Sequence, residues 1–329
     1  MSVSPDAYRN IGVVGAGAWG RALAIAAAAA GCHVVLWGRN RARTHVGTHE
    51  RGADRGFPDV GLPEQVVPTT ELAEVCANQA LLVAVPAQHL RASVMALKKF
   101  SAPQLPVVIC AKGVEQHSGL LMNEVLQEAA PELLPAMLSG PSFARDVALG
   151  LPTAVTIAAP IATAERLQAA LSSGAFRPYA SDDLTGVALG GAAKNVYAIA
   201  CGIVEGLHLG ESARAALLAR AFAELTRLGE AMGARRETLM GLSGLGDLVL
   251  TATSRTSRNF SRGVAIGERQ AQRPQALAEG VYTAPALVTR AQRHGIELPI
   301  AEAVADILSG KLELEHAAAR LMQRPLKAE

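Results

Sequence analysis

The amino-acid sequence predicts an α/β domain with a doubly wound parallel sheet, followed by a second domain that is built only of helices. From residue 10 to about residue 160, short apolar segments alternate with helical stretches. Several of these segments are apolar throughout, as strands buried on both faces of a sheet must be. Near residue 187 the alternation stops, and no further strand is predicted. We therefore expect one domain over residues 1–187 and a second over residues 188–329.

The strands of the first domain are predicted from six short apolar segments separated by helical stretches. Connections of this kind cross over one face of a parallel sheet and are almost always right-handed. The charged segment 39–63 repeats glycine and proline, so it is interpreted as a long surface connection after the second strand. The predicted strands are residues 11–14, 33–37, 80–85, 107–111, 136–139 and 153–158.

The second domain is predicted to be helical from the spacing of its apolar residues. Leu218, Phe222 and Leu225 recur at three- and four-residue intervals, and Glu224 and other charged residues fall away from this stripe. Three further helices are predicted, and the first two end at a glycine, as helices commonly do. They are residues 284–295, 299–310 and 314–324.

Charge and cysteine content exclude several classes of function. The chain has 31 basic and 29 acidic residues and a net charge of +2, which argues against a nucleic-acid partner. Its four cysteines are widely spaced, which indicates neither a disulfide framework nor a zinc site and fits the cytoplasm. The apolar run 22–31 is too short to span a bilayer, so no integral membrane segment is predicted. His45 and His49 are interpreted as surface histidines, and no metal is expected.

A glycine-rich motif lies between the first predicted strand and an alanine-rich helix. Here Gly15, Gly17 and Gly20 allow a tight turn, close approach of the backbone to a pyrophosphate, and close packing of the helix on the sheet. The N-terminus of the helix then faces the anion. A glycine turn without a ligand is the alternative, but the strand-turn-helix context favours a Rossmann-like site for a dinucleotide.

The residues after the second predicted strand bear on the choice of cofactor. NAD-specific sites usually carry an Asp or Glu there, which binds the ribose 2′-hydroxyl. This chain has Arg39, followed by Arg41 and Arg43. Because an arginine can pair with a 2′-phosphate, the sequence predicts a preference for NADPH over NADH. A solvated loop arginine is the alternative.

Two lysines and one acid are candidates for the chemistry. Lys112 follows a predicted strand at the carboxyl edge of the sheet, where ligands of open α/β folds bind. Lys194 lies near the start of an otherwise apolar helix, where a charge is costly to bury unless it is paired or used. A lysine of lowered pKa can donate the proton that ketone reduction requires, and Asp247 could steer its ammonium group. The alternatives are a surface charge for Lys112 and snorkelling to solvent for Lys194.

Three arginines follow the glycine-rich stretch 241–247. Arg255, Arg258 and Arg262 are three and then four residues apart, so on one helix they would share a face. Hydroxyl and amide groups lie among them, and such a set suits a phosphate. A solvated basic face is the alternative. We expect Arg258 to bind an anion, and the other two arginines to be solvated or structural charges.

Taken together, the motifs resemble those of the bacterial NAD(P)-dependent glycerol-3-phosphate dehydrogenases. They are GAGAWG, VVLWGRN, AKGVE, SGPSFARDVALGLPTA, LGGAAKNVYAIACGI, GLSGLGDLVLTATSRTSRN and AEG, in the family's order from about residue 10 to near residue 320. The resemblance implies a 6-phosphogluconate dehydrogenase-like fold with a Rossmann-like and a helical domain. It also implies an oxidoreductase that reduces dihydroxyacetone phosphate to sn-glycerol 3-phosphate with NAD(P)H and supplies glycerophospholipid synthesis.

The resemblance also assigns roles to residues. Lys194 matches the general acid and base, Lys112 a lysine shared by substrate and nicotinamide, and Asp247 completes the catalytic set. Two positions depart from the family, because Ala18 lacks the hydroxyl of the frequent serine and Leu277 stands where valine is common. The substrate-binding matches are Lys112, Gly140, Ser142, Lys194, Asp247, Ser257, Arg258 and Asn259. The cofactor-binding matches are Gly15, Gly17, Ala18, Trp19, Gly20, Arg39, Lys112, Ala144, Arg258, Leu277 and Glu279.

Two alternative functions stay open at this point. A β-hydroxyacid dehydrogenase or ketopantoate reductase commonly has an asparagine four residues after the helix lysine, where this chain has Ala198, and Asn195 follows the lysine directly. A catalytically silent NADPH sensor would be free to lose its chemical groups, but Lys112, Lys194 and Asp247 are all present. The sequence does not determine the oligomeric state, and a homodimer stays open.

Overall fold

The chain forms two compact units in the computed structural model, which describes residues 7–40, 60–270 and 277–317. The N-terminal unit comprises the chain up to Lys112 together with Met122–Ala188. The helical unit comprises Gly113–Leu121 and the chain from Leu189 onward. The segment Gly113–Leu121 thus belongs to the helical unit although it lies between two parts of the N-terminal unit in the sequence. The two domains predicted to meet at residue 187 were each continuous in sequence, and that boundary stays a prediction.

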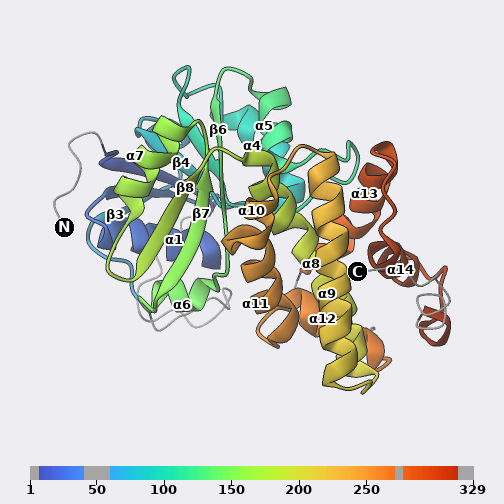
Figure 1. Ribbon diagram of the computed structural model, residues 1–329. Coiled ribbons are helices and arrows are strands. Elements are labelled where there is room, and N and C mark those ends of the chain that lie inside the picture. The colour runs from blue at the N-terminus through green and yellow to red at the C-terminus, as the bar shows by residue number, and fades with distance from the viewer. Residues whose placement is uncertain (1–6, 41–59, 271–276, 318–329) are drawn as a thin grey trace. The chain divides into compact units, whose positions relative to one another are not determined.

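An eight-stranded sheet is the centre of the N-terminal unit (Figure 1). Its strand order is β3-β2-β1-β4-β5-β6-β7-β8. Neighbouring strands are parallel, except that β6 and β7 are antiparallel. The strands are β1 (Asn10–Val14), β2 (His33–Trp37), β3 (Val66–Thr69), β4 (Ala80–Val83), β5 (Pro106–Ile109), β6 (Leu134–Ser139), β7 (Thr153–Ala158) and β8 (Phe176–Ser181).

The predicted class, an α/β sheet domain followed by helices, is confirmed, but the sheet differs from the prediction in two respects. First, it is not wholly parallel, because an apolar segment does not encode the direction of its strand. Second, the sequence missed β3 and β8, which are the two edge strands. Pro68 in β3 is a residue suited to an edge, and β8 alternates at its start between buried Phe176 and exposed Arg177. Neither has the continuous apolar pattern that identified the other strands.

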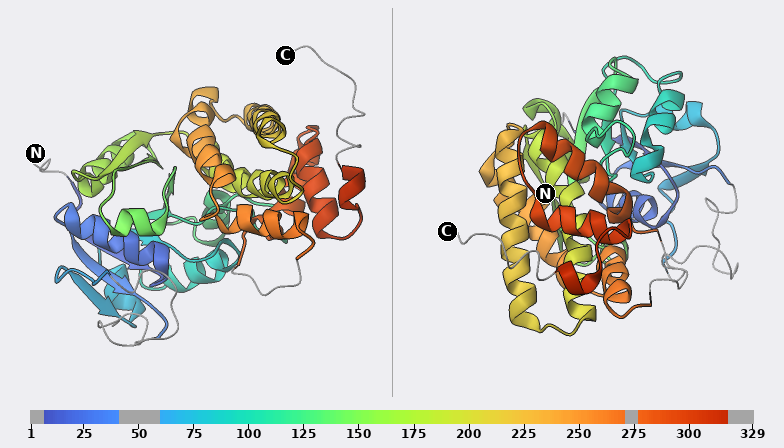
Figure 2. Two further views of the ribbon diagram at one scale, coloured as in Figure 1. Left: turned by 90° about the horizontal axis from the view of Figure 1, so that it is seen from below. Right: turned by 90° about the vertical axis from the view of Figure 1, so that its right-hand side faces the viewer.

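Helices cover both faces of the sheet (Figure 2). The helices α1, α6 and α7 pack over one face, where Leu23 and Leu167 are part of the core. The helices α3, α4 and α5 lie over the other face. Their bounds are α1 (Ala18–Ala29), α3 (Leu72–Cys76), α4 (Leu90–Leu97), α5 (Met122–Ala129), α6 (Ala144–Ala148) and α7 (Ile161–Leu171).

Among the described residues no strand follows α8, as the sequence predicted. The predicted helices 284–295 and 299–310 correspond to α13 and α14, while residues 318–324 of the third lie outside the described residues. The helices are α8 (Leu184–Gly206), α9 (Glu211–Ala231), α10 (Arg236–Met240), α11 (Asp247–Thr253), α12 (Arg258–Gly267), α13 (Gly280–Arg293) and α14 (Pro299–Leu308).

The long helix α8 is a core helix. By length and composition alone it could cross a membrane, but 94% of its apolar window is buried inside the protein. Its backbone contacts that of α12 directly. A Cβ atom on Gly202 would lie 2.1 Å from the carbonyl oxygen of Phe260, and one on Gly263 would lie 2.1 Å from that of Ile199. Glycine at these positions therefore permits the close approach of the two helices.

Glu224 is buried, although it lies off the apolar stripe from which this helix was predicted. Its side chain is only 3% exposed. The carboxylate accepts a hydrogen bond from the hydroxyl of Tyr197 at 3.3 Å and one from the backbone N–H of Ile300 at 2.8 Å. The second of these caps the start of α14, whose own N-cap residue, Leu298, has no polar side chain. A tertiary contact of this kind leaves no trace in helical periodicity.

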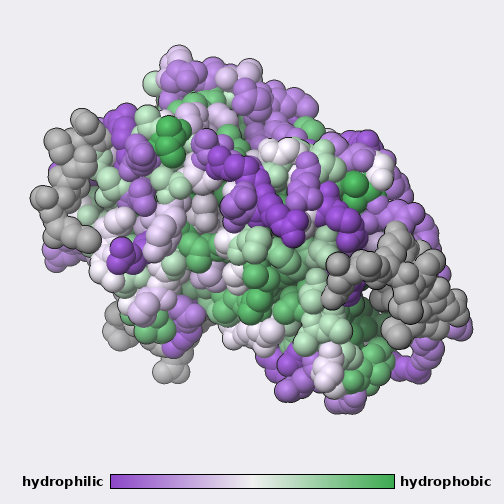
Figure 3. Space-filling view, in the orientation of Figure 1, coloured by the Kyte–Doolittle hydropathy of each residue, from purple (hydrophilic) through white to green (hydrophobic). Residues whose placement is uncertain are grey.

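Polar residues cover much of the face drawn in Figure 3, and apolar residues gather over α10 and α11 of the helical unit. Met240 and Val249 in these helices are 56% and 41% exposed.

Candidate active site

The turn between β1 and α1 holds three glycines at the N-terminus of a helix. Gly15 has a φ of 109°, which glycine adopts without strain. A Cβ atom on Gly20 would lie 1.8 Å from the carbonyl oxygen of Gly15, so only glycine fits there. Gly17 is the N-cap of α1, and no described heavy atom lies within 4 Å of the position of its missing Cβ. The first N–H groups of the helix are thus open to an anion.

The other residues that the sequence predicts for the cofactor in the N-terminal unit lie at the starts of helices and after β2. Ala18 and Trp19 begin α1, and Ala144 begins α6. The indole N–H of Trp19 is buried and has no hydrogen-bond partner among the described residues, so a bound molecule could accept from it. Arg39 is exposed. Four residues named in the sequence analysis lie outside the described residues, namely Arg41, Arg43, His45 and His49.

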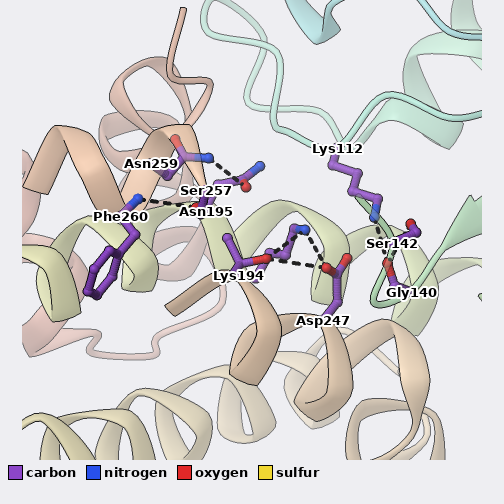
Figure 4. Close-up of polar contacts among 10 residues, drawn as sticks. Lys112, Gly140, Ser142, Lys194, Asn195, Asp247, Ser257, Asn259 and Phe260 are labelled. Atoms are coloured by element: carbon purple, nitrogen blue, oxygen red, sulfur yellow. Dashed lines mark hydrogen bonds and ion pairs between the residues drawn. The ribbon is translucent and has the colours of Figure 1, made fainter. Parts of the chain in front are cut away.

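Lys112 lies three residues after the end of β5 and is half-buried. Its ammonium nitrogen donates to the carbonyl oxygen of Gly140 at 3.0 Å, and the hydroxyl of Ser142 donates to the same oxygen at 3.0 Å (Figure 4). Gly140 has a φ of 148°, and a Cβ atom there would lie 2.8 Å from the Cα atom of Val155. The structure therefore brings Lys112, Gly140 and Ser142 together at the carboxyl ends of β5 and β6.

The ammonium group of Lys194 is buried and paired. Lys194 is 8% exposed, and its Nζ atom donates to Oδ1 of Asp247 and, at 2.9 Å, to the hydroxyl of Thr251 (Figure 4). The Thr251 hydroxyl also lies 3.3 Å from Oδ1 of Asp247. The predicted proximity of Asp247 and Lys194 is observed. Sequence reasoning missed Thr251, although its position four residues after Asp247 on α11 places both side chains on one helical face.

The stretch GLSGLGD brings Asp247 to α8 by close backbone packing. Residues Leu242–Gly246 form a π-helical turn that leads directly into α11. A Cβ atom on Gly190 would lie 2.6 Å from the carbonyl oxygen of Ser243, so the turn touches α8 one helical turn before Lys194. The close backbone approach expected from the glycines is therefore made to α8 itself. Single π-helical turns of this kind are frequent at functional sites.

Two buried asparagines connect three helices of the helical unit. The amide nitrogen of Asn259 donates to Oδ1 of Asn195 at 2.8 Å, and its own Oδ1 accepts from the backbone N–H of Gly280 at 2.9 Å. Asn195 and Asn259 are 5% and 8% exposed. The side chain of Asn259 thereby ties the start of α12 to α8, beside Lys194, and to the first residue of α13. Asn195 was not predicted as a site residue, because its role depends on this contact with a helix 64 positions away in the chain.

The three arginines that follow the glycine-rich stretch 241–247 do not share one helix. Arg258 is the first residue of α12 and is exposed, while Ser257 is the N-cap, whose hydroxyl accepts from the backbone N–H of Phe260 at 3.2 Å. Arg255 precedes the helix, because the backbone is extended at both Ser254 and Ser257. Its guanidinium group lies 3.4 Å from Oε1 of Glu205. The predicted common face is thus wrong for Arg255, and Arg258 is the arginine in the first turn of α12.

Comparison with known proteins identifies the family. Residues 10–165 match the NAD-dependent glycerol-3-phosphate dehydrogenase N-terminus, and residues 183–319 match the C-terminus of the same family. The chain belongs to the NAD-dependent glycerol-3-phosphate dehydrogenase family.

The chain is similar to members of this family over nearly its whole length. It is 54% identical over 331 residues to the glycerol-3-phosphate dehydrogenase [NAD(P)+] of Parvibaculum lavamentivorans, covering 98% of this chain and 99% of that protein. The crystal structure of glycerol-3-phosphate dehydrogenase from Coxiella burnetii has a TM-score of 0.89 and 35% identity, covering 97% and 100%. A ketopantoate reductase from Ralstonia eutropha shares the fold alone, with a TM-score of 0.59 and 16% identity, covering 94% and 99%.

Two further residues that match cofactor positions of the glycerol-3-phosphate dehydrogenases, Leu277 and Glu279, lie just before α13. Leu277 is 44% exposed, and Glu279 is the N-cap of the helix. Gly280, which follows Glu279, is the residue bonded by Asn259. The segment that carries both predicted cofactor residues is therefore held by the asparagine pair at its last position.

The cysteines closest in sequence to the two lysines are neutral thiols. Burial raises the pKa of Cys110, two residues before Lys112, to about 12, although the Lys112 ammonium acts against this shift. Burial likewise raises the pKa of Cys201, seven residues after Lys194 on α8, to about 12. Because the thiolate is the reactive form, these cysteines are inert at neutral pH.

Proposed function

We propose that this chain reduces dihydroxyacetone phosphate to sn-glycerol 3-phosphate with a nicotinamide cofactor. The observation that carries the proposal is the buried ammonium group of Lys194, held by Asp247 and Thr251. Burying a charge is costly unless it is paired or used, and the family to which the chain belongs is named for a ketone-alcohol interconversion. A fixed proton donor is the group that this conversion requires.

Lys194 is proposed as the general acid of the reduction. The nicotinamide supplies the hydride to the carbonyl carbon, and the ammonium group of Lys194 gives a proton to the oxygen as it becomes an alkoxide. Asp247 and Thr251 orient the ammonium group, because both accept its hydrogen bonds. In the reverse direction the neutral amine takes the proton back. General acid catalysis of this kind is typically worth about 10² to 10⁴ in rate.

Lys112 is proposed to place positive charge at the reacting centre. Its Nζ atom donates to the carbonyl oxygen of Gly140, and the hydroxyl of Ser142 donates to the same carbonyl oxygen. The place of Lys112 at the carboxyl ends of β5 and β6 is where ligands of open α/β sheets bind, which supports a contact with the substrate. Gly140 and Ser142 are proposed as further substrate contacts through their backbone and hydroxyl groups.

The start of α12 is proposed as the binding site for the substrate phosphate. The first N–H groups of a helix have no carbonyl partner within it, and together with the helix dipole they favour an anion. Arg258 and Asn259 supply such N–H groups, and Arg258 adds an exposed guanidinium. The Ser257 hydroxyl, which accepts from Phe260 as the cap, keeps its own hydrogen for donation.

The glycine turn is proposed to bind the pyrophosphate of the cofactor. The open backbone at Gly17 and the buried, unpartnered indole N–H of Trp19 fit a bound dinucleotide. Arg39 is placed after β2, where it could pair with a 2′-phosphate, so NADPH is proposed as the preferred cofactor with NAD(H) as the second. The remaining proposed cofactor contacts are Gly15, Ala18, Gly20, Lys112, Ala144, Arg258, Leu277 and Glu279.

The proposed product is a precursor of glycerophospholipids, which fits a cytoplasmic enzyme with a small-molecule substrate and no nucleic-acid partner. A homodimer is not required by any residue of this proposal, because the proposed acid, phosphate and cofactor groups all belong to one chain.

The proposal is tested by following nicotinamide oxidation with dihydroxyacetone phosphate. We expect turnover with both cofactors and a higher kcat/KM with NADPH than with NADH. Arg39→Asp should reverse this preference, because it removes the partner of the 2′-phosphate and offers an acceptor to a ribose 2′-hydroxyl. Equal use of the two cofactors by the wild type would contradict the preference, and absence of turnover with either would contradict the function.

A further inference from the structure

The segment Gly113–Leu121 is a compact loop within the helical unit. An antiparallel bridge joins Val114 to Leu121, both of which are fully buried. Within the loop, the Ser118 hydroxyl donates to the carboxylate of Glu115 at 2.5 Å, and the backbone N–H of Gly119 donates to the carbonyl of Glu115 at 2.9 Å. The loop is thus folded by its own hydrogen bonds and does not simply connect β5 to α5.

Two arginines of α13 hold the turn of this loop. Arg290 donates from Nη1 to the carbonyl oxygen of Gly119 at 2.9 Å, and Arg293, one helical turn later, donates from Nη1 to that of Ser118 at 3.1 Å. Gly119 has a φ of 72°, and a Cβ atom there would lie 3.3 Å from Nη1 of Arg293. Arg290 is 8% exposed, whereas Arg293 is exposed, so the Arg290 bond is the one shielded from water.

Lys112 is the residue immediately before this loop. Its side chain is fixed by the carbonyl oxygen of Gly140, and its own carbonyl carbon is bonded to Gly113, where the loop begins. The backbone of Lys112 can therefore move only as far as the loop allows. Asn259 of the predicted site contacts α13 at its first residue, Gly280, ten residues before Arg290. The hydrogen bond of Arg290 to Gly119 therefore connects the middle of α13 to Lys112 through this loop.

We propose that Arg290 is a positioning residue for Lys112, acting through the loop 113–121. This inference rests on the proposed function, in which Lys112 binds the substrate. Without Arg290, the Gly119 carbonyl loses its shielded partner, the turn loosens, and the backbone at Lys112 samples conformations in which its ammonium group is misplaced. A displacement of about 1 Å at a reacting centre can cost about 10²-fold in rate.

The test is a double-mutant cycle of Arg290→Met and Lys112→Met, measured as kcat/KM for dihydroxyacetone phosphate. We expect Arg290→Met to lower kcat/KM by about 10- to 100-fold in the wild-type background. In the Lys112→Met background it should have almost no further effect, because the residue through which it acts is gone. The same cycle measured on the affinity for sn-glycerol 3-phosphate in the NADPH complex needs no turnover, because an alcohol and a reduced nicotinamide cannot exchange a hydride.

Two further variants separate positioning from folding. Arg290→Lys keeps a donor on a flexible stem and should recover part of the loss, while Arg293→Met removes the exposed partner and should have a smaller effect. An Arg290→Met enzyme whose melting temperature falls while kcat and KM stay normal would overturn the inference. A double variant whose loss in kcat/KM equals the product of the losses in the two single variants would overturn it as well. Failure of the wild type to reduce dihydroxyacetone phosphate would instead contradict the proposed function.

Discussion

At the scale of single residues, the buried carboxyl of Glu224 is expected to make the stability of the helical unit depend on pH. Burial raises the pKa of Glu224 to about 7, against the backbone N–H groups of Ile300 and Ala301, which favour the carboxylate. Its hydrogen bonds to α8 and α14 place this titration between three helices. The pKa of Tyr197, its hydroxyl partner, is also raised, first by burial and then by the charge of Glu224.

We predict that Glu224→Gln changes the pH dependence of stability. A carboxyl whose folded pKa lies above its ordinary value of 4.5 stabilises the fold fully below that value, and this contribution is lost as the pH rises through about 7. The stability advantage of the wild type over the variant should therefore fall by about 1–3 kcal/mol between pH 4 and pH 8. Urea unfolding at several pH values measures it, and parallel curves for the two proteins would contradict the expectation.

At the scale of elements, the start of α12 separates two arginines that the sequence pattern groups together. Arg258 lies in the first turn of the helix, where the helix dipole and the first backbone N–H groups favour an anion. Arg255 is bonded to Glu205, at the end of α8, and its side chain is 66% exposed. Helical spacing predicted a shared face only because it did not detect the extended backbone at Ser254 and Ser257.

We predict that Arg258→Ala raises the KM for dihydroxyacetone phosphate by about 10- to 100-fold. A hydrogen bond to a charged group is worth about 1.5–3 kcal/mol, and each 1.4 kcal/mol is tenfold in affinity. Arg255→Ala is the matched control and should leave KM nearly unchanged, because exposed ion pairs contribute little. Steady-state kinetics at saturating NADPH distinguish the two. Equal increases in both variants would place the phosphate elsewhere.

At the scale of the whole molecule, the sequence predicted what depends on local patterns. Strands buried on both faces, the glycine turn before α1 and the approach of Asp247 to Lys194 follow from apolar runs, glycine spacing and the resemblance to the family. The edge strands β3 and β8, the buried carboxyl of Glu224 and Thr251 beside Lys194 were missed. Each of these features depends on contacts between segments far apart in the chain. The periodicity of a single sequence does not encode such contacts.

The excursion of Gly113–Leu121 into the helical unit is the clearest case of such a contact. Its residues read as an ordinary connection after β5, and the arginines that hold it come more than 160 positions later, with Arg290 separated from Gly119 by 171 residues. A single domain boundary placed in the sequence assumes that each unit is continuous. It therefore cannot assign to the helical unit a loop that lies between two segments of the N-terminal unit.

Lys194 is the proposed proton donor of the reaction. The most direct test is the turnover number of Lys194→Ala with dihydroxyacetone phosphate and NADPH. Circular dichroism and NADPH binding serve as controls for the fold, because the substitution leaves the buried Asp247 without its cation. We predict that turnover falls by about 10² to 10⁴ or more while NADPH still binds. A correctly folded Lys194→Ala enzyme with near-normal turnover would contradict the account.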